Sequence, residues 1–179
     1  RDRNVINKNI TEENIFSSVR QAIELGWKHI KFYFMMGLPG ETFEDLDGIA
    51  DIARRVMQLN REMHVDKGNR FNVTVSVSNF VPKAHTPFQW APQDEDFTEK
   101  HDYLSDRMKI KGVSFHYHDD PVSRLEGVFA RGDRRTGYFL EEAWKNGCKF
   151  DSWSEQYNAE GWKKAEKAFF EKYGYSTSF

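Results

Sequence analysis

Lys31-Phe-Tyr-Phe-Met-Met-Gly-Leu-Pro-Gly-Glu-Thr42 is the part of this sequence that decides its fold. Its aromatic and apolar residues up to Met36 are typical of a covered β-strand. Gly37 and Gly40 let the backbone bend sharply and approach a ligand closely, and Pro39 stiffens the turn between them. The closing threonine can cap a helix whose first turn is acidic. We therefore predict a strand, a tight turn and a helix start, which is where α/β proteins hold their ligands.

Helices are predicted on both sides of this strand. Thr11 can cap a first helix, whose apolar stripe has helical spacing. The stripe consists of Ile15, Phe16, Val19, Ala22 and Ile23. After the turn, apolar residues recur at helical spacing and predict a helix from about Phe43 to Met63. A loop at residues 3–9 and a turn at residues 66–69 are also expected.

The strand predicted from Phe71 to Phe80 alternates strictly. Valines lie on one face of the strand, and small polar residues lie on the other, namely Asn72, Thr74, Ser76 and Ser78. Two strands joined by a helix are expected to be parallel, with a right-handed crossover. Because parallel sheets are normally covered on both faces, the polar face favours an open, wet cavity. A solvent-exposed edge strand is the alternative.

Bulk composition excludes several classes of protein. The chain has 179 residues, of which 39% are hydrophobic and 30% charged, as in a globular protein rather than a disordered one. A net charge of −2 gives no general reason to expect nucleic acid or an anionic membrane as a partner. No apolar run approaches the ~20 residues that cross a bilayer. One cysteine and no signal peptide indicate a cytoplasmic protein without an internal disulfide.

The composition changes after Trp90-Ala-Pro92, where an acidic stretch indicates a linker or a helix entrance. Downstream, apolar spacing predicts four helices and one short strand at residues 113–118. We therefore divide the chain into an α/β part, residues 1–92, and a mostly helical C-terminal extension, residues 93–179. Because the chain opens at Arg1 without an initiator Met, we expect it to be a piece of a longer protein.

Two strings carry a resemblance to a known family. Gly37-Leu-Pro-Gly-Glu-Thr42 resembles the fifth strand and following helix of radical S-adenosylmethionine (radical SAM) enzymes. Asn79-Phe-Val-Pro-Lys-Ala-His-Thr-Pro-Phe88 resembles the end of the sixth strand of the same barrel. The resemblance implies an α/β fold in which residues 1–92 form the C-terminal part of a partial (β/α)6 radical SAM barrel, from the fourth helix to the sixth strand. The strings Leu125-Glu126, Ala130-Arg-Gly-Asp-Arg-Arg135 and Phe150-Asp-Ser-Trp-Ser-Glu155 resemble the tail of an uncharacterised subgroup, so residues 93–179 resemble that tail. In this subgroup a cobalamin-binding-like domain often accompanies the radical domain.

What the resemblance implies about function is reductive cleavage of S-adenosylmethionine by a 4Fe–4S cluster, which gives a deoxyadenosyl radical that abstracts hydrogen from an unknown substrate. In the family, the turn after the fifth strand and apolar residues after the sixth flank the cofactor. The corresponding positions in this chain are Met35, Gly37, Pro39, Gly40, Glu41, Phe80 and Val81, with Ser76 and Ser78 facing the lumen. We expect the glycine at 37 to leave room for a nucleotide. No residue can be assigned as a catalytic acid or base.

The cluster of this family needs three cysteine thiolates spaced Cys-x-x-x-Cys-x-x-Cys, whereas Cys148 is the single cysteine of this chain. We therefore expect the cluster ligands outside this chain, the remainder of its own polypeptide as its first partner, and an inactive protein when the chain is alone. S-adenosylmethionine and the 4Fe–4S cluster are the implied cofactors, with cobalamin as a further candidate.

Three further groups of polar residues have both a functional and a structural interpretation. Lys83 and His85, in the loop after the polar strand, are candidates for substrate contact. His116-x-His118 with adjacent carboxylates has the composition of a metal site, but helix capping and strand burial explain it better, so no metal ligand is assigned. Arg131 to Arg135 can bind phosphate or an RNA backbone, or can be a solvated helix break paired with acidic neighbours.

A non-catalytic role is the competing hypothesis. In it, the aromatic tail docks onto a protein or RNA partner, since large aromatic side chains also supply stacking surfaces. A cysteine triplet upstream in the coding sequence would decide for the enzyme. An unrelated α/β enzyme complete in itself is disfavoured, because no nucleophile or acid/base constellation is present.

Overall fold

The computed structural model describes residues 10–63, 71–94, 96–174 and 176–177, and the chain divides into two compact units. The first unit holds the described residues up to Asn79 and residues 96–118. The second holds residues 80–94 and those from Asp119 onward. The loop expected at residues 3–9 and the turn expected at 66–69 lie outside the described residues.

A three-stranded parallel sheet forms the centre of the first unit. Its strands are β1 (His29–Met36), β2 (Asn72–Asn79) and β3 (Val113–Tyr117), in the spatial order β1-β2-β3. Tyr33 pairs in register with Ser76, and Ser76 with His116. The prediction that the first two strands are parallel neighbours is confirmed, since the helix between them returns the chain to the same edge.

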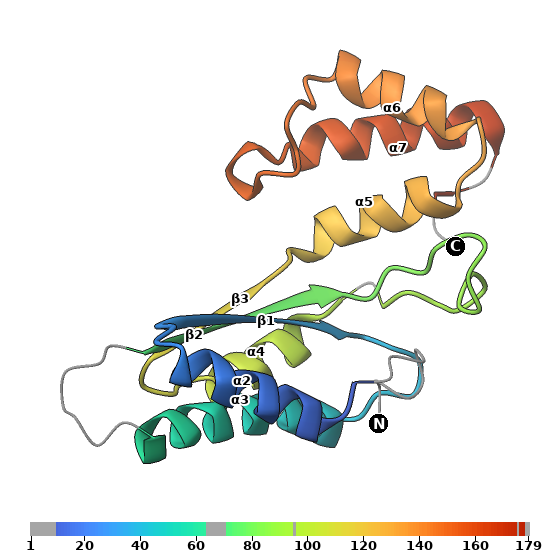
Figure 1. Ribbon diagram of the computed structural model, residues 1–179. Coiled ribbons are helices and arrows are strands. Elements are labelled where there is room, and N and C mark those ends of the chain that lie inside the picture. The colour runs from blue at the N-terminus through green and yellow to red at the C-terminus, as the bar shows by residue number, and fades with distance from the viewer. Residues whose placement is uncertain (1–9, 64–70, 95, 175, 178–179) are drawn as a thin grey trace. The chain divides into compact units, whose positions relative to one another are not determined.

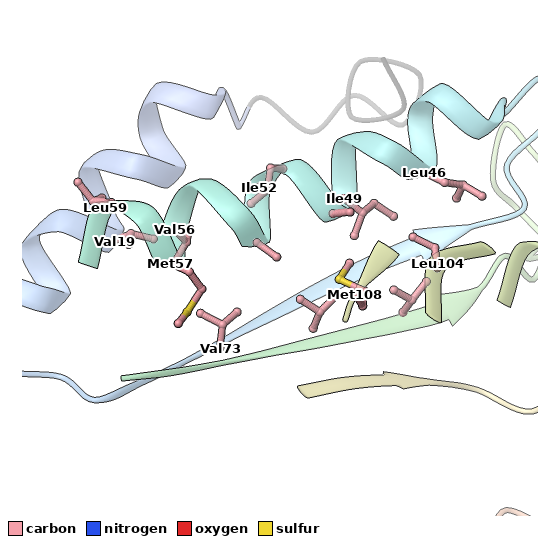
Figure 2. Close-up of a cluster of buried hydrophobic side chains, with 14 of the residues drawn as sticks. Val19, Leu46, Ile49, Ile52, Val56, Met57, Leu59, Val73, Leu104 and Met108 are labelled. Carbon is pink, nitrogen blue, oxygen red and sulfur yellow. The ribbon is translucent and has the colours of Figure 1, made fainter. Parts of the chain in front are cut away.

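One face of the sheet is covered by α2 (Glu12–Glu24), α3 (Phe43–Met63) and α4 (Thr98–Arg107), as Figure 1 shows. Val73, Val75 and Val77 of β2 are fully buried in the core that these helices share with the sheet. Figure 2 shows side chains of α3, including Leu46 and Met57, within this core. Each fully buried valine stabilises the fold by roughly 1.5–3 kcal/mol, so the alternation predicted from the sequence fixes which face is covered.

The start of α2 follows the predicted capping chemistry, and α3 begins directly after Thr42, whose N–H and hydroxyl both donate to Asp45. Thr11 and Asn14 form a reciprocal capping box, in which Thr11 Oγ1 accepts from the Asn14 N–H at 3.2 Å and Asn14 Oδ1 accepts from the Thr11 N–H at 3.0 Å. At α3, Asp45 Oδ2 accepts from the Thr42 N–H at 2.9 Å and from its hydroxyl at 2.8 Å. Both helices therefore begin within one residue of the predicted positions.

The other face of the sheet carries no helix of the first unit among the residues that the structure describes. Ser76 and Ser78 lie on this face and are half-buried, as the alternation with the buried valines requires. The predicted polar face is thus confirmed, and it is called the open face below. The structure shows a mixed α/β unit with a three-stranded parallel sheet.

The division at residue 92 expected from composition does not coincide with the two units. Phe97, Leu104 and Met108 are buried in the core of the sheet unit, so α4 belongs with α2 and α3. β3 then adds a third parallel strand. Residues 80–94 group instead with the C-terminal helices. The acidic stretch at 93–96 marks a crossing between units rather than the end of the α/β part.

The second unit contains α5 (Asp120–Arg131), α6 (Thr136–Lys145), a short 3₁₀ helix (Ser154–Gln156) and α7 (Ala159–Tyr173). Aromatic side chains dominate its core, with Phe139 and Trp162 at a centroid distance of 5.2 Å. Arg124 Nη2 donates to Glu166 Oε1 at 2.8 Å, and the Thr177 hydroxyl donates to the same oxygen at 2.6 Å. Burial raises the pKa of Glu166, but the hydrogen bonds from Thr177 and Arg124 outweigh it and hold the pKa below its usual value of 4.5.

Across the described ranges, every helix is too short or too polar to cross a bilayer.

Candidate functional site

The turn after β1 is a tight loop with two left-handed glycines. Gly37 has φ +87° and Gly40 has φ +79°, conformations that side chains rarely adopt. The Glu41 N–H donates to the Leu38 carbonyl oxygen at 2.9 Å and closes the turn. The turn therefore lies at the carboxyl end of β1, as predicted, and the two glycines explain how the chain reverses there.

The Glu41 carboxylate folds back onto the turn rather than pointing into solvent. Its Oε1 accepts from the Gly37 N–H at 2.9 Å and lies 3.2 Å from Lys100 Nζ on α4. The Glu41 side chain is only 1% exposed, and that of Lys100 is 24% exposed. A buried carboxylate held by an ammonium and a backbone N–H fixes the shape of the turn, so Glu41 has a structural role at this position.

The room that the sequence predicted beside Gly37 for a nucleotide is occupied by Phe97. A Cβ added at Gly37 would lie 2.4 Å from Cε1 and 2.9 Å from Cζ of the Phe97 ring, which is itself buried in the sheet core. At Gly40 an added Cβ would meet nothing within 4 Å, and Pro39 beside it is exposed. The open space at this edge of the sheet is therefore at Gly40, while the space beside Gly37 is filled by the Phe97 ring of the core.

On the open face, the strand register brings polar side chains into rows. One row is Met35 and Ser78, and the next is Tyr33, Ser76 and His116. Ser78 Oγ donates to the Phe34 carbonyl oxygen at 3.2 Å, whereas Tyr33 is 73% exposed and Met35 39% exposed. The structure thus brings together three of the predicted site residues, Met35, Ser76 and Ser78, on one face.

Tyr33 and His116 were not assigned to this face from the sequence. Tyr33 is at one of the alternate positions of β1 that pair with the polar positions of β2. Aligning the two strands in register would have placed it on this face. His116 was considered only as a metal ligand, and its place beside Ser76 depends on β3 joining the sheet. His29 Nε2 also lies 2.8 Å from Thr74 Oγ1 on the same face.

A buried polar cluster lies at the carboxyl end of β2. His101 of α4 is stacked on Tyr117 with ring centroids 3.9 Å apart, and its Nε2 lies 3.1 Å from Asn79 Oδ1. Asn79 Nδ2 donates to the His118 carbonyl oxygen at 3.2 Å, so Oδ1 is an acceptor and the proton is on His101 Nε2. Asn79 continues the alternation of the buried valines, which is the signal that could have predicted its burial.

The remaining predicted site residues belong to the second unit and are described within it. Phe80 and Val81 are buried, and Phe80 meets Phe88 edge-on at 5.7 Å. Lys83 forms an ion pair with Glu126 of α5. His85 is exposed and has φ +62°, a left-handed conformation uncommon for a residue other than glycine.

Arg131, at the end of α5, and Arg135, just before α6, make contacts within their own unit. Arg131 Nη1 donates to the Ala91 carbonyl oxygen at 2.9 Å, which ties residues 80–94 to α5. Arg135 forms an ion pair with Asp133. These contacts favour the helix-break interpretation over a phosphate-binding patch.

Cys148 has the environment of a structural thiol. It is buried, and its Sγ lies 3.8 Å from the Asn158 carbonyl oxygen. Burial raises the pKa of the Cys148 thiol, and the nearby Asp151 carboxylate adds to this effect. Among the residues that the structure describes, no group of three or more His, Cys, Asp or Glu side chains is arranged to hold a metal ion.

Comparison with known proteins gives one distant relative, an uncharacterised protein of Methanocaldococcus jannaschii. It is 28% identical to this chain over 139 residues. The alignment covers 78% of this chain but 29% of the relative, so the chain spans less than a third of the length of that protein. No protein-family model matches the chain, and no solved structure matches it significantly.

Proposed function

We propose that this chain forms part of the S-adenosylmethionine-binding wall of a radical SAM enzyme, as a section of its partial (β/α)6 barrel. The observation that carries the proposal is the Gly37–Thr42 turn at the carboxyl end of a parallel sheet with one polar face that no described helix of its own unit covers. Parallel α/β sheets hold their ligands at this end. A polar face on a parallel strand fits the lumen of an open barrel better than it fits a packed core.

The residues at this edge fit a nucleotide-sized ligand unevenly. Gly40 and Pro39 leave open space, and Met35 and Ser78 supply an apolar and a hydroxyl contact on the adjacent open face. The Glu41 side chain is buried against Lys100 and stabilises the turn, so it is not directed toward a ligand. In this proposal the backbone of the turn and the open face bind and orient the cofactor.

The cluster does not fit this chain by itself. Cys148 is buried in the second unit, and a 4Fe–4S cluster of this family takes three cysteine thiolates, so its ligands would lie outside these 179 residues. S-adenosylmethionine cleaved at such a cluster supplies a radical that abstracts hydrogen from substrate.

The direct test uses the complete open reading frame that contains these residues. Anaerobic reconstitution with iron and sulfide is expected to give an iron–sulfur absorbance and reductive cleavage of S-adenosylmethionine, while the 179-residue chain alone gives neither. Failure of the complete protein to take up a cluster would refute the proposal, as would a stoichiometric cluster on the chain alone.

A matched pair of glycine variants tests the assignment of the turn. Gly40→Val and Gly26→Val both place a side chain at a left-handed glycine with nothing within 4 Å, so their backbone strain is similar. Gly26 lies after α2, away from the sheet's carboxyl edge. Loss of S-adenosylmethionine affinity only in Gly40→Val supports the site, and equal affinities in the two variants would contradict it.

Exposed aromatic side chains in the second unit favour docking as a second candidate function. Trp144 on α6 and Phe150 and Trp153 in the following loop are each more than half exposed. Such side chains are enriched at protein interfaces and stack on unpaired RNA bases. Titration with single-stranded RNA while following tryptophan fluorescence tests this role. Saturable quenching that Phe150→Ala weakens would support RNA docking, and its absence would leave a protein partner as the docking hypothesis.

A further inference from the structure

The open face carries side chains that can hold an anion. Across the three strands, Lys31 pairs in register with Thr74, and Thr74 with Ser114. The neighbouring row on the same face is Tyr33, Ser76 and His116. These two adjacent rows present an ammonium, an imidazole, a phenol and three hydroxyls, all of which donate hydrogen bonds.

The charge on this face is of one sign. None of the side chains that β1, β2 and β3 direct to the open face is an aspartate or a glutamate. Lys31 supplies a positive charge, and its Nζ lies 4.8 Å from the centroid of the Tyr33 ring. An anionic group on this face would therefore meet attraction from the ammonium and no repulsion from a carboxylate on the same strands.

The spacing suits a small ligand. Neighbouring strands lie about 4.8 Å apart, so the three side chains of one row stand side by side on the same face. Tyr33 and His116 are exposed at the two ends of their row, and Ser76 is half-buried between them. An anion placed over Ser76 would lie between the phenol and the imidazole, with the hydroxyl beneath it.

We propose that the Tyr33–Ser76–His116 row, with Lys31 beside it, binds the oxyanion group of a small-molecule ligand. The shared chemistry is that of a phosphate or a carboxylate, both of which accept several hydrogen bonds. This inference deepens the function proposed above and rests on it only in naming the ligand as the substrate of that enzyme. The row then fixes the anionic end of the substrate and leaves the rest of it free toward the carboxyl edge of the sheet.

The test titrates the chain, in separate experiments, with inorganic phosphate and with acetate. Binding is followed by NMR through the His116 imidazole and Tyr33 ring signals. Lys31→Met removes the charge beside the row, and Lys163→Met removes the charge of an exposed lysine on α7 as the matched control. Tyr33→Phe removes only a hydroxyl, so it leaves the packing of the face unchanged.

We expect saturable shifts of both signals with at least one of the two anions. Because a charge-assisted interaction with the anion is lost, Lys31→Met is expected to weaken binding about tenfold or more, while Lys163→Met leaves it unchanged. Saturation with phosphate alone identifies a phosphorylated ligand, and saturation with acetate identifies a carboxylate. Shifts that do not saturate with either anion, or equal affinities in Lys31→Met and Lys163→Met, overturn the proposal.

The outcome is separable from that of the proposed function. The anion titration involves no cluster and no S-adenosylmethionine, so anion binding can be present in a protein that fails reconstitution. In that case the radical SAM proposal fails and the anion site stands. A complete protein that cleaves S-adenosylmethionine while its open face ignores both anions refutes the anion site alone.

Discussion

Replacing Gly37 with alanine should destabilise the chain more than the same change at Gly40. Both glycines have left-handed backbone, with φ +87° and +79°. Only at Gly37 would the new Cβ enter an occupied space, at 2.4 Å from Cε1 of Phe97. That ring is 1% exposed in the sheet core, so it cannot turn away into solvent.

The magnitude follows from two separate costs. A left-handed conformation costs an alanine ~1–2 kcal/mol relative to glycine, and this term applies to both variants. Overpacking a filled core adds ~1–3 kcal/mol, and this term applies to Gly37→Ala alone. We therefore expect a loss of ~2–5 kcal/mol for Gly37→Ala and ~1–2 kcal/mol for Gly40→Ala.

Urea denaturation followed by far-ultraviolet circular dichroism measures both losses in the same chain. The Phe97→Leu substitution, made alone and with Gly37→Ala, completes a double-mutant cycle. Because leucine vacates part of the space that the ring fills, the two changes should be less damaging together than their sum, by about 1 kcal/mol.

Equal destabilisation by the two alanines would refute this reasoning, as would a cycle with no coupling. Either result would mean that the Phe97 ring does not require a glycine at 37. The space beside Gly37 would then again be a candidate for the nucleotide that the sequence led us to expect there. Full binding of S-adenosylmethionine by a folded Gly37→Ala protein would support a structural role for Gly37.

Three further outcomes are expected. Lys100→Met leaves the buried Glu41 carboxylate without its ammonium neighbour, so the free energy of unfolding in urea titrations should fall by an amount near the lower end of ~3–5 kcal/mol. An unchanged urea midpoint would show that the pair does not stabilise the turn. Cys148, whose pKa burial raises, should have little thiolate at neutral pH and react with an aromatic disulfide reagent more slowly than glutathione does; reaction at the rate of glutathione would show an accessible thiol. Because the folded-state pKa of Glu166 is lowered, its stabilising effect is present above pH 4.5 and is lost as pH falls through the folded-state pKa. The difference in unfolding free energy between the unmodified chain and Glu166→Gln should therefore shrink on acidification. A difference that grows would contradict the lowered pKa.

Local patterns predicted the elements of the α/β part well because they are set by short-range chemistry. The valines of β2 alternate with small polar residues, and a period of two leaves one choice of buried face. Thr11 caps α2 because its hydroxyl satisfies a helix N–H that has no partner within the helix. Such signals involve residues close in sequence, so they can be read without knowing the tertiary structure.

What the sequence did not predict depends on which segments meet. The short strand at 113–118 was expected, but its place beside β2 was not, and with it the position of His116 on the open face. The boundary at residue 92 followed a change in composition, whereas the packing of Phe97 and Leu104 places α4 with the sheet. Contacts between distant segments leave no periodic signal in the chain.

The Gly37–Thr42 turn shows how far a motif can be interpreted by itself. Its glycine at 37 is required by Phe97, and its carboxylate at Glu41 is held by Lys100. Phe97 and Lys100 come from the start of α4, far along the chain, so the shape of the turn is set by residues that the motif does not contain. The motif therefore predicts where a ligand site lies, at the carboxyl end of β1. In the anion site proposed above, the chemistry comes instead from the open face, where three strands each contribute one residue to a row that no single stretch of sequence displays.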